Sequence, residues 1–206
     1  MTTFKPLLIG LALALGLGAC GSVPPVHLDE TWPATVPDYG DTTAAWTRQA
    51  TLRGQFQETV DLRATFKSPD WRASHADRVA EQRGLTGAAR DQVLAQAQAD
   101  MAGPYELELM VTTWDRREND LDRGKKSVWH VVLVDEQGRE IEPLEIVKDR
   151  RPPYVMRAEF PALGDFATAY VARFPRTTPV LGPSVRTMRL RMSSERGAVE
   201  LVWAAP

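Results

Sequence analysis

The chain has 206 residues, of which 43% are hydrophobic and 25% are charged. A chain of this length can form one domain that buries roughly 70% of the surface of its unfolded state. With 25 Lys and Arg against 27 Asp and Glu, the formal net charge is −2. The chain therefore lacks the broad positive charge that attracts nucleic acids, and we expect no nucleic-acid partner.

The first twenty residues have the layout of a secretory leader. Lys5 precedes an apolar run from Leu7 to Leu17, which is too short to cross about 30 Å of hydrocarbon. The run ends in Leu17-Gly18-Ala19-Cys20, which resembles the lipobox of bacterial lipoproteins. An ordinary cleaved signal peptide and a buried N-terminal helix are the alternatives, and the Pro24-Pro25 step argues against the helix.

The resemblance implies a lipid anchor. Residues 1–19 would be a lipoprotein signal peptide, and the Cys20 thiol would receive a diacylglyceryl group. The mature N-terminus would then carry fatty-acyl chains such as palmitate. Because Cys20 is the only cysteine, no internal disulfide competes for its thiol. Gly21 is not the aspartate associated with inner-membrane retention in enteric bacteria. We therefore expect anchoring to the outer membrane, facing the periplasm.

Residues 20–45 are rich in Pro, Thr and Asp and show no sustained periodicity. This composition predicts a flexible tether between the lipid and a single folded domain over residues 46–206. The alternative is that part of it, from Leu28 to Trp32, docks on the domain as an irregular edge.

The domain begins with alternating apolar residues over 50–56 and 60–66, typical of strands. Ser68-Pro69-Asp70 then predicts a helix with Ser68 as its cap, and Thr86 is the expected cap of a second helix. The two form a helical insertion over about residues 69–103. After Pro104 the pattern returns to strands, expected near 105–111, 128–134, 141, 146, 154–160, 166–174, 185–192 and 198–203. The fold class is mostly β, an antiparallel β-sandwich with a helical pair inserted after the first strands.

No motif identifies a catalytic activity. The three histidines have no metal-ligand spacing, and no nucleophile motif or phosphate loop occurs after the leader. We expect no catalytic residues, metal ion or cofactor. The acidic loop with Asp115, Asn119, Asp120 and Asp122 could bring oxygens to a calcium ion, although interleaved cations favour a solvated loop.

Two further features could bind a partner. Lys148, Arg150 and Arg151 beside Pro152-Pro153 could bind an anionic group, or simply form a polar loop. Aromatic residues at element ends, including Trp114, could form a sugar- or peptide-binding platform, or plug an end of the sandwich.

The leading hypothesis for function is a non-enzymatic binding or assembly module, anchored in the bacterial envelope and contacting another envelope protein or a cell-wall component. One alternative is an envelope hydrolase that uses carboxylates at strand ends, such as Glu106, Glu108, Asp115 and Glu118. The other is a β-sandwich module that responds to Ca²⁺ or lipid through the acidic loop.

Overall fold

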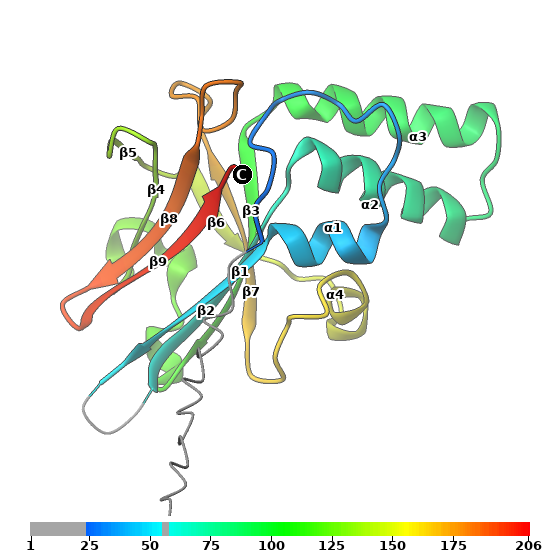
Figure 1. The fold of residues 1–206 in the computed structure, drawn as a ribbon. Coiled ribbons are helices and arrows are strands. Elements are labelled where there is room, and N and C mark those ends of the chain that lie inside the picture. The colour runs from blue at the N-terminus through cyan, green and yellow to red at the C-terminus, as the bar shows by residue number, and fades with distance from the viewer. Residues whose placement is uncertain (1–23, 55–57) are drawn as a thin grey trace, which may run out of the picture.

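The protein is a sandwich of two antiparallel sheets, seen in a computed structural model that describes residues 24–54 and 58–206 (Figure 1). Sheet A has the strand order β1-β2-β3-β7-β6, and sheet B has the order β5-β4-β8-β9. The fold class predicted from the sequence is confirmed, including the helical pair after the first strands. The strands are β1 Thr47–Arg53, β2 Glu58–Phe66, β3 Tyr105–Thr113, β4 His130–Val134, β5 Glu140–Ile141, β6 Glu145–Lys148, β7 Thr168–Phe174, β8 Thr187–Ser194 and β9 Gly197–Ala204. The helices are α1 Tyr39–Trp46, α2 Pro69–Gln82, α3 Ala88–Ala99 and α4 Pro153–Glu159, with short 3-10 turns η1 Asp100–Ala102, η2 Arg116–Glu118 and η3 Leu121–Lys126.

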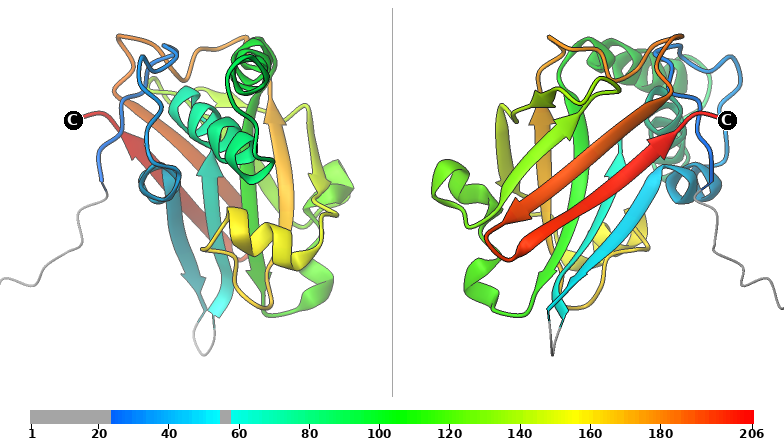
Figure 2. Two further views of the ribbon diagram at one scale, coloured as in Figure 1. Left: turned by 90° about the vertical axis from the view of Figure 1, so that its right-hand side faces the viewer. Right: turned by 60° about the vertical axis from the view of Figure 1, so that its left-hand side comes forward.

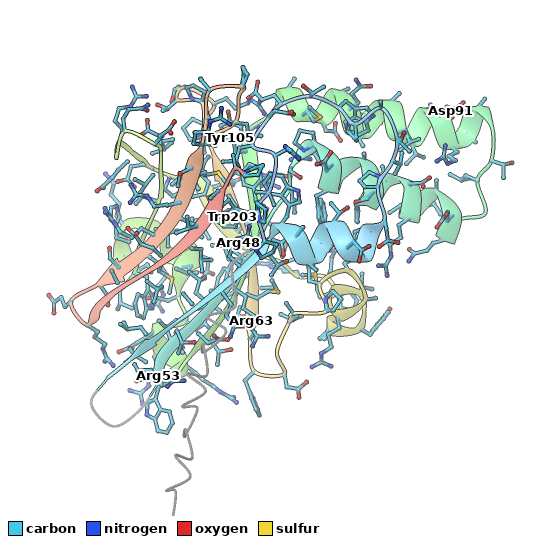
Figure 3. The ribbon with its side chains drawn as sticks, in the orientation of Figure 1. Arg48, Arg53, Arg63, Asp91, Tyr105 and Trp203 are labelled. Atoms are coloured by element: carbon cyan, nitrogen blue, oxygen red, sulfur yellow. The ribbon has the colours of Figure 1, made fainter. Side chains whose placement is uncertain are left out.

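The main core lies between the two sheets. Alternate residues of each strand point inward, as in Leu107 and Leu109 of β3, and both are fully buried. β1 and β9 lie side by side where the sheets meet, and the Trp203 indole donates a 2.9 Å hydrogen bond to the Trp46 carbonyl there (Figure 3). The right-hand view of Figure 2 shows sheet B in front of sheet A.

Helices α1, α2 and α4 cover the outer face of sheet A (Figure 2, left). A second cluster of buried apolar side chains forms there, in which the rings of Trp71 and Phe160 stack 5.7 Å apart. Ser68 caps α2 as predicted, since its Oγ accepts a hydrogen bond from the Trp71 amide at 3.1 Å. No helix within the described ranges is long and apolar enough to cross a bilayer.

Two local predictions were wrong. Residues 154–160 form helix α4 and not a strand: Pro153 starts the helix, and Met156 and Phe160, four residues apart, are both buried. The N-cap of α3 is Gly87 rather than Thr86, and no residue of α3 is buried. α3 therefore packs on α2 at the outside of the helical layer (Figure 1).

The prediction of a flexible tether over residues 20–45 was also wrong from Val26 onward. Val26 and Leu28 are buried in the main core, and the Val26 amide donates a 3.0 Å hydrogen bond to the Ala204 carbonyl. The buried guanidinium of Arg48 holds the same segment, because its Nη2 donates to the Pro24 carbonyl at 2.8 Å. Residues 39–46 form α1. These contacts bury apolar side chains that a free tether would expose to water.

Candidate functional site

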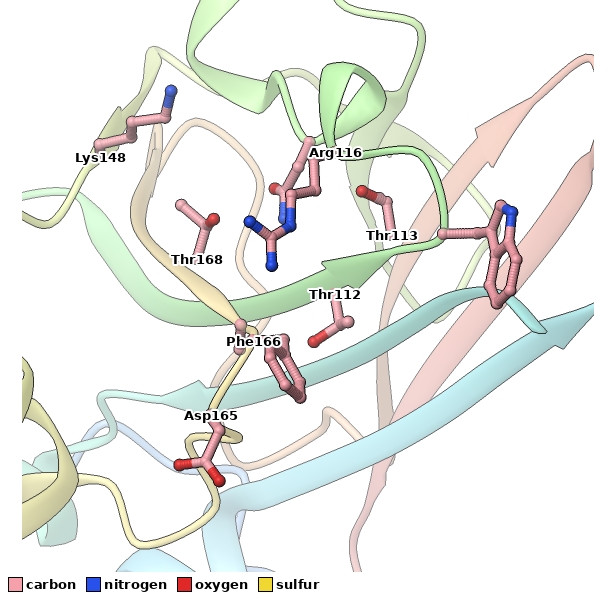
Figure 4. A pocket seen from close by; sticks show the side chains of 10 residues that line it. Thr112, Thr113, Arg116, Lys148, Asp165, Phe166 and Thr168 are labelled. Carbon is pink, nitrogen blue, oxygen red and sulfur yellow. The ribbon is translucent and has the colours of Figure 1, made fainter.

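An open groove forms at the end of sheet A where β3 extends beyond β7. The last β3–β7 pair is Val111 with Thr168, whereas Thr112 and Thr113 pair only with β2. The loop that precedes β7 and the turn η2 that follows β3 form the walls of the groove. It has a volume of about 640 Å³ (Figure 4). Its lining residues are Thr112, Thr113, Trp114, Arg116, Asn119, Lys148, Asp165, Phe166, Ala167 and Thr168.

Two aromatic side chains of the groove are unusually exposed. Phe166 is 76% exposed and Trp114 is 67% exposed. Large apolar side chains that remain in water in this way, beside a concave surface, commonly mark a binding site. The exposed rings make this groove the strongest candidate site in the described part of the chain.

The wall formed by η2 is held in place by a buried tyrosine. The Tyr170 hydroxyl donates to Asn119 Oδ1 at 2.8 Å, and Asn119 Nδ2 donates to the Val111 carbonyl at 2.8 Å. Burial raises the pKa of Tyr170, so its hydroxyl keeps the proton that it donates. The groove is therefore built on a wall fixed by hydrogen bonds to β3 and β7.

The charges in the groove are partly neutralised. Lys148 Nζ lies 3.3 Å from Asp122 Oδ1, and Asp165 Oδ1 accepts a hydrogen bond from Arg157 Nη2 at 2.8 Å. Arg116 forms no ion pair with the acidic side chains that the structure describes. Figure 4 shows its guanidinium group within the same open space as Thr112, Thr168 and the ring of Phe166. The groove therefore carries one uncompensated positive charge from its described side chains.

The candidate calcium ligands are used in contacts within the protein. Asp120 is buried, and its Oδ1 accepts hydrogen bonds from the Ser127 hydroxyl at 2.8 Å and the Val128 amide at 3.2 Å. Asn119 supports the groove wall, Asp122 pairs with Lys148, and Asp115 caps η2. Across residues 24–54 and 58–206, no group of three or more His, Cys, Asp or Glu side chains could hold a metal ion.

The three cations that could bind an anionic group, Lys148, Arg150 and Arg151, lie in different surroundings. Lys148 lines the groove, and Arg150 is exposed. Arg151 instead turns toward the helical layer, where it pairs with Asp149 at 2.7 Å and also with Glu159. The three cations therefore do not form one anion-binding surface.

A buried ionic cluster lies between sheet A and the helices. Glu108 of β3 has no exposed surface; Lys67 Nζ is 3.2 Å and Arg151 Nη2 is 3.8 Å from its Oε2. No described donor meets either carboxylate oxygen in hydrogen-bond geometry. Burial raises the pKa of Glu108 to about 7, against the opposing effect of Lys67.

The same cluster continues toward α2. His75 Nε2 lies 3.6 Å from Glu159 Oε1, and the His75 ring stacks on Trp71 at 4.7 Å. Burial alone would raise the pKa of Glu159, but hydrogen bonding and charge from His75 and Arg151 lower it overall. The cluster joins α2 and α4 to the sheet, and the full burial of Glu108 keeps solvent and substrate from that carboxylate.

The acidic residues considered for hydrolysis do not converge in the groove. Glu106 pairs with Arg173 at 2.7 Å and Arg72 at 3.0 Å, and Glu118 pairs with Arg196. Among the described residues that line the groove, Asp165 is the single carboxylate. Glycoside hydrolysis usually needs two carboxylates on opposite sides of the bond, so this groove does not provide that arrangement.

Sequence reasoning identified Trp114 and Lys148 but missed Phe166 and Arg116 as parts of one site. The sequence pattern predicts a strand that begins at Phe166, whereas Phe166 lies in the loop before β7. Comparisons with protein-family models, with curated proteins and with solved structures gave no match. The geometry of the groove is therefore the basis for a functional proposal.

Proposed function

We propose that this protein is a lipid-anchored binding module of the bacterial envelope, attached through Cys20 and recognising its partner in the groove at the end of sheet A. The observation that carries the binding role is the exposure of Phe166 and Trp114 beside a concave, partly cationic surface. The lipobox-like sequence that ends at Cys20 supports the anchor.

The docked N-terminal segment supports a position close to the membrane. Pro24 is held by Arg48 and lies four positions after Cys20, with three residues between them. Whatever path the chain takes, these four residue steps span at most about 14 Å. A lipidated Cys20 would therefore hold the folded domain against the bilayer surface, so that its partner would be found near the membrane.

Lipidation is tested by growing cells with an alkyne-tagged fatty acid and measuring the label and the intact mass of the protein. We expect a labelled protein that begins at Cys20, loss of the label in Cys20→Ser, and retention in the neighbouring control Ser22→Ala. An unlabelled chain that begins at Met1 would contradict the anchor.

Partner binding is tested by placing a photo-cross-linking residue at position 166 in the full-length protein in intact envelopes. Tyr154 provides the matched control position, because it is 75% exposed but does not line the groove. We expect a cross-linked product from position 166 and none from position 154. Equal products from both positions, or none from either, would contradict the groove as the binding site for an envelope protein.

A further inference from the structure

We propose that the ligand of the groove is an anionic sugar, whose carboxylate or phosphate group pairs with Arg116 and whose ring packs on Phe166. This inference rests on the proposed function, since it names the ligand class of the same groove. Three features of the lining support it: an unpaired guanidinium group, exposed aromatic rings and free hydroxyl groups.

The guanidinium group of Arg116 defines the anionic part of the ligand. Lys148 and Asp165 have their charges paired within the protein, at 3.3 Å and 2.8 Å, whereas Arg116 forms no ion pair with a described acidic side chain. A guanidinium offers donors in a planar fork that matches a carboxylate or a phosphate. The uncompensated charge thus favours an anion at this point of the groove.

The aromatic rings require more than a small inorganic ion. Phe166 and Trp114 expose most of their surface to water, and a free phosphate ion would leave them so. A ligand with a flat, partly apolar face would cover them and gain from the removal of apolar surface from water. The two faces of a sugar ring carry C–H groups of this kind.

Hydroxyl groups distinguish a sugar from a lipid or a peptide strand. Neither the Thr112 hydroxyl nor the Thr168 hydroxyl has a hydrogen-bond partner among the described residues, and both line the groove. An acyl chain would leave these polar groups unpaired. A peptide could add to the free edge of β3 only along Thr112 and Thr113, which is too short for strand addition. A polyhydroxylated ligand can bond to both threonines.

The dimensions suit a short saccharide. A volume of about 640 Å³ falls within the range of small-ligand sites, and the groove is open at its surface. It can therefore take one part of a longer glycan while the rest continues into solvent.

The experiment measures binding to the full-length protein in detergent by calorimetry, with a short uronic acid oligosaccharide, its neutral counterpart of equal length, a sugar phosphate and inorganic phosphate as probes. We expect the uronic acid oligosaccharide or the sugar phosphate to bind at least tenfold more tightly than the neutral sugar and than inorganic phosphate. The stronger of the two identifies the anionic group.

Substitutions place the ligand in the groove. Arg116→Gln should weaken binding of the anionic sugar about tenfold to a hundredfold and leave the neutral sugar unaffected. Arg117→Gln is its control, because the Arg117 side chain is 93% exposed and lies outside the groove. Phe166→Ala should weaken both sugars, and Tyr154→Ala should weaken neither.

Equal affinity for the anionic and neutral sugars, or equal effects of the substitutions at 116 and 117, would overturn the inference. If no sugar binds while position 166 still cross-links to an envelope protein, the ligand class is wrong and the proposed binding function stands. If position 166 gives no cross-link but the anionic sugar binds through Arg116, the ligand class stands and the partner is a glycan.

Discussion

Glu108 provides a direct test of the buried ionic cluster. Its side chain is fully buried, and burial raises its pKa from 4.5 to about 7. The folded protein therefore holds this proton more tightly than the unfolded chain does. As the pH rises from about 4.5 to 7, the unfolded state loses the proton first, and the free energy of unfolding falls. A pKa difference of this size corresponds to about 3 kcal/mol.

Glu108→Gln keeps the shape of the protonated carboxyl group and cannot ionise. We expect the variant to gain stability relative to the parent protein as the pH rises, by about 3 kcal/mol between pH 4 and pH 8.5. The measurement is denaturant unfolding followed by tryptophan fluorescence, with Cys20→Ser present in both proteins to exclude lipidation. The difference between the two curves isolates the titration of Glu108 from that of other groups.

Glu106→Gln is the control on the same face of β3. Burial tends to raise the pKa of Glu106, but Lys67, Arg173 and Arg72 together lower it. Its ionised form is therefore favoured by folding, and Glu106→Gln should lose stability relative to the parent as the pH rises through the acid range. A constant difference between Glu108→Gln and the parent at all pH values would refute the reasoning about Glu108.

Three further predictions concern stability and are measured by denaturant unfolding at pH 7. Arg48→Met should lower the free energy of unfolding by about 3 kcal/mol, because the buried guanidinium donates to carbonyls that include those of Pro24 and Val202. Arg53→Met, at an exposed position, should have little effect, and equal effects of the two substitutions would contradict the role of Arg48. Phe160→Ala should cost about 3 to 5 kcal/mol, since the ring is 1% exposed, while Phe166→Ala should change stability by less than about 0.5 kcal/mol. A large loss in Phe166→Ala would show that its ring is structural. Ser68→Ala should cost about 1 kcal/mol and Thr86→Ala almost nothing, because Ser68 caps α2 and Gly87 occupies the N-cap of α3; the reverse order would contradict the cap assignment.

The sequence predicted the sandwich well because alternation and turn residues are local signals. The Ser68-Pro69 start of α2 is likewise a local signal, and the structure bears it out. Helix α4 was mistaken for a strand because Tyr154, Met156, Ala158 and Phe160 alternate in sequence, as the residues of one strand face do. Met156 and Phe160, four residues apart, also share one face of a helix, and both are buried. Short apolar segments of this kind satisfy both periodicities, and Pro153 was the signal that favoured a helix.

The candidate site was harder to predict because it depends on strand register. The sequence around Thr112 does not show that β3 extends beyond β7. This extension follows from the strand register, in which Val111 pairs with Thr168. The burial of Glu108 is hard to predict for a similar reason, because its alternation with Leu107 and Leu109 is typical of a solvent-facing residue. Helices α2 and α4 cover that face, and their position is a property of the tertiary fold.

The outer face of sheet A separates stability from recognition, because the helices cover its middle and not the end of β3. Over the middle of the outer face, α2 and α4 close on Glu108 and exclude water, and the ionic cluster there joins the layers. At the end of β3 the helical layer no longer covers the strand, so Thr112, Phe166 and Arg116 remain accessible. A substitution in the cluster should therefore change the stability of the protein and leave ligand affinity intact, whereas a substitution in the groove should do the opposite.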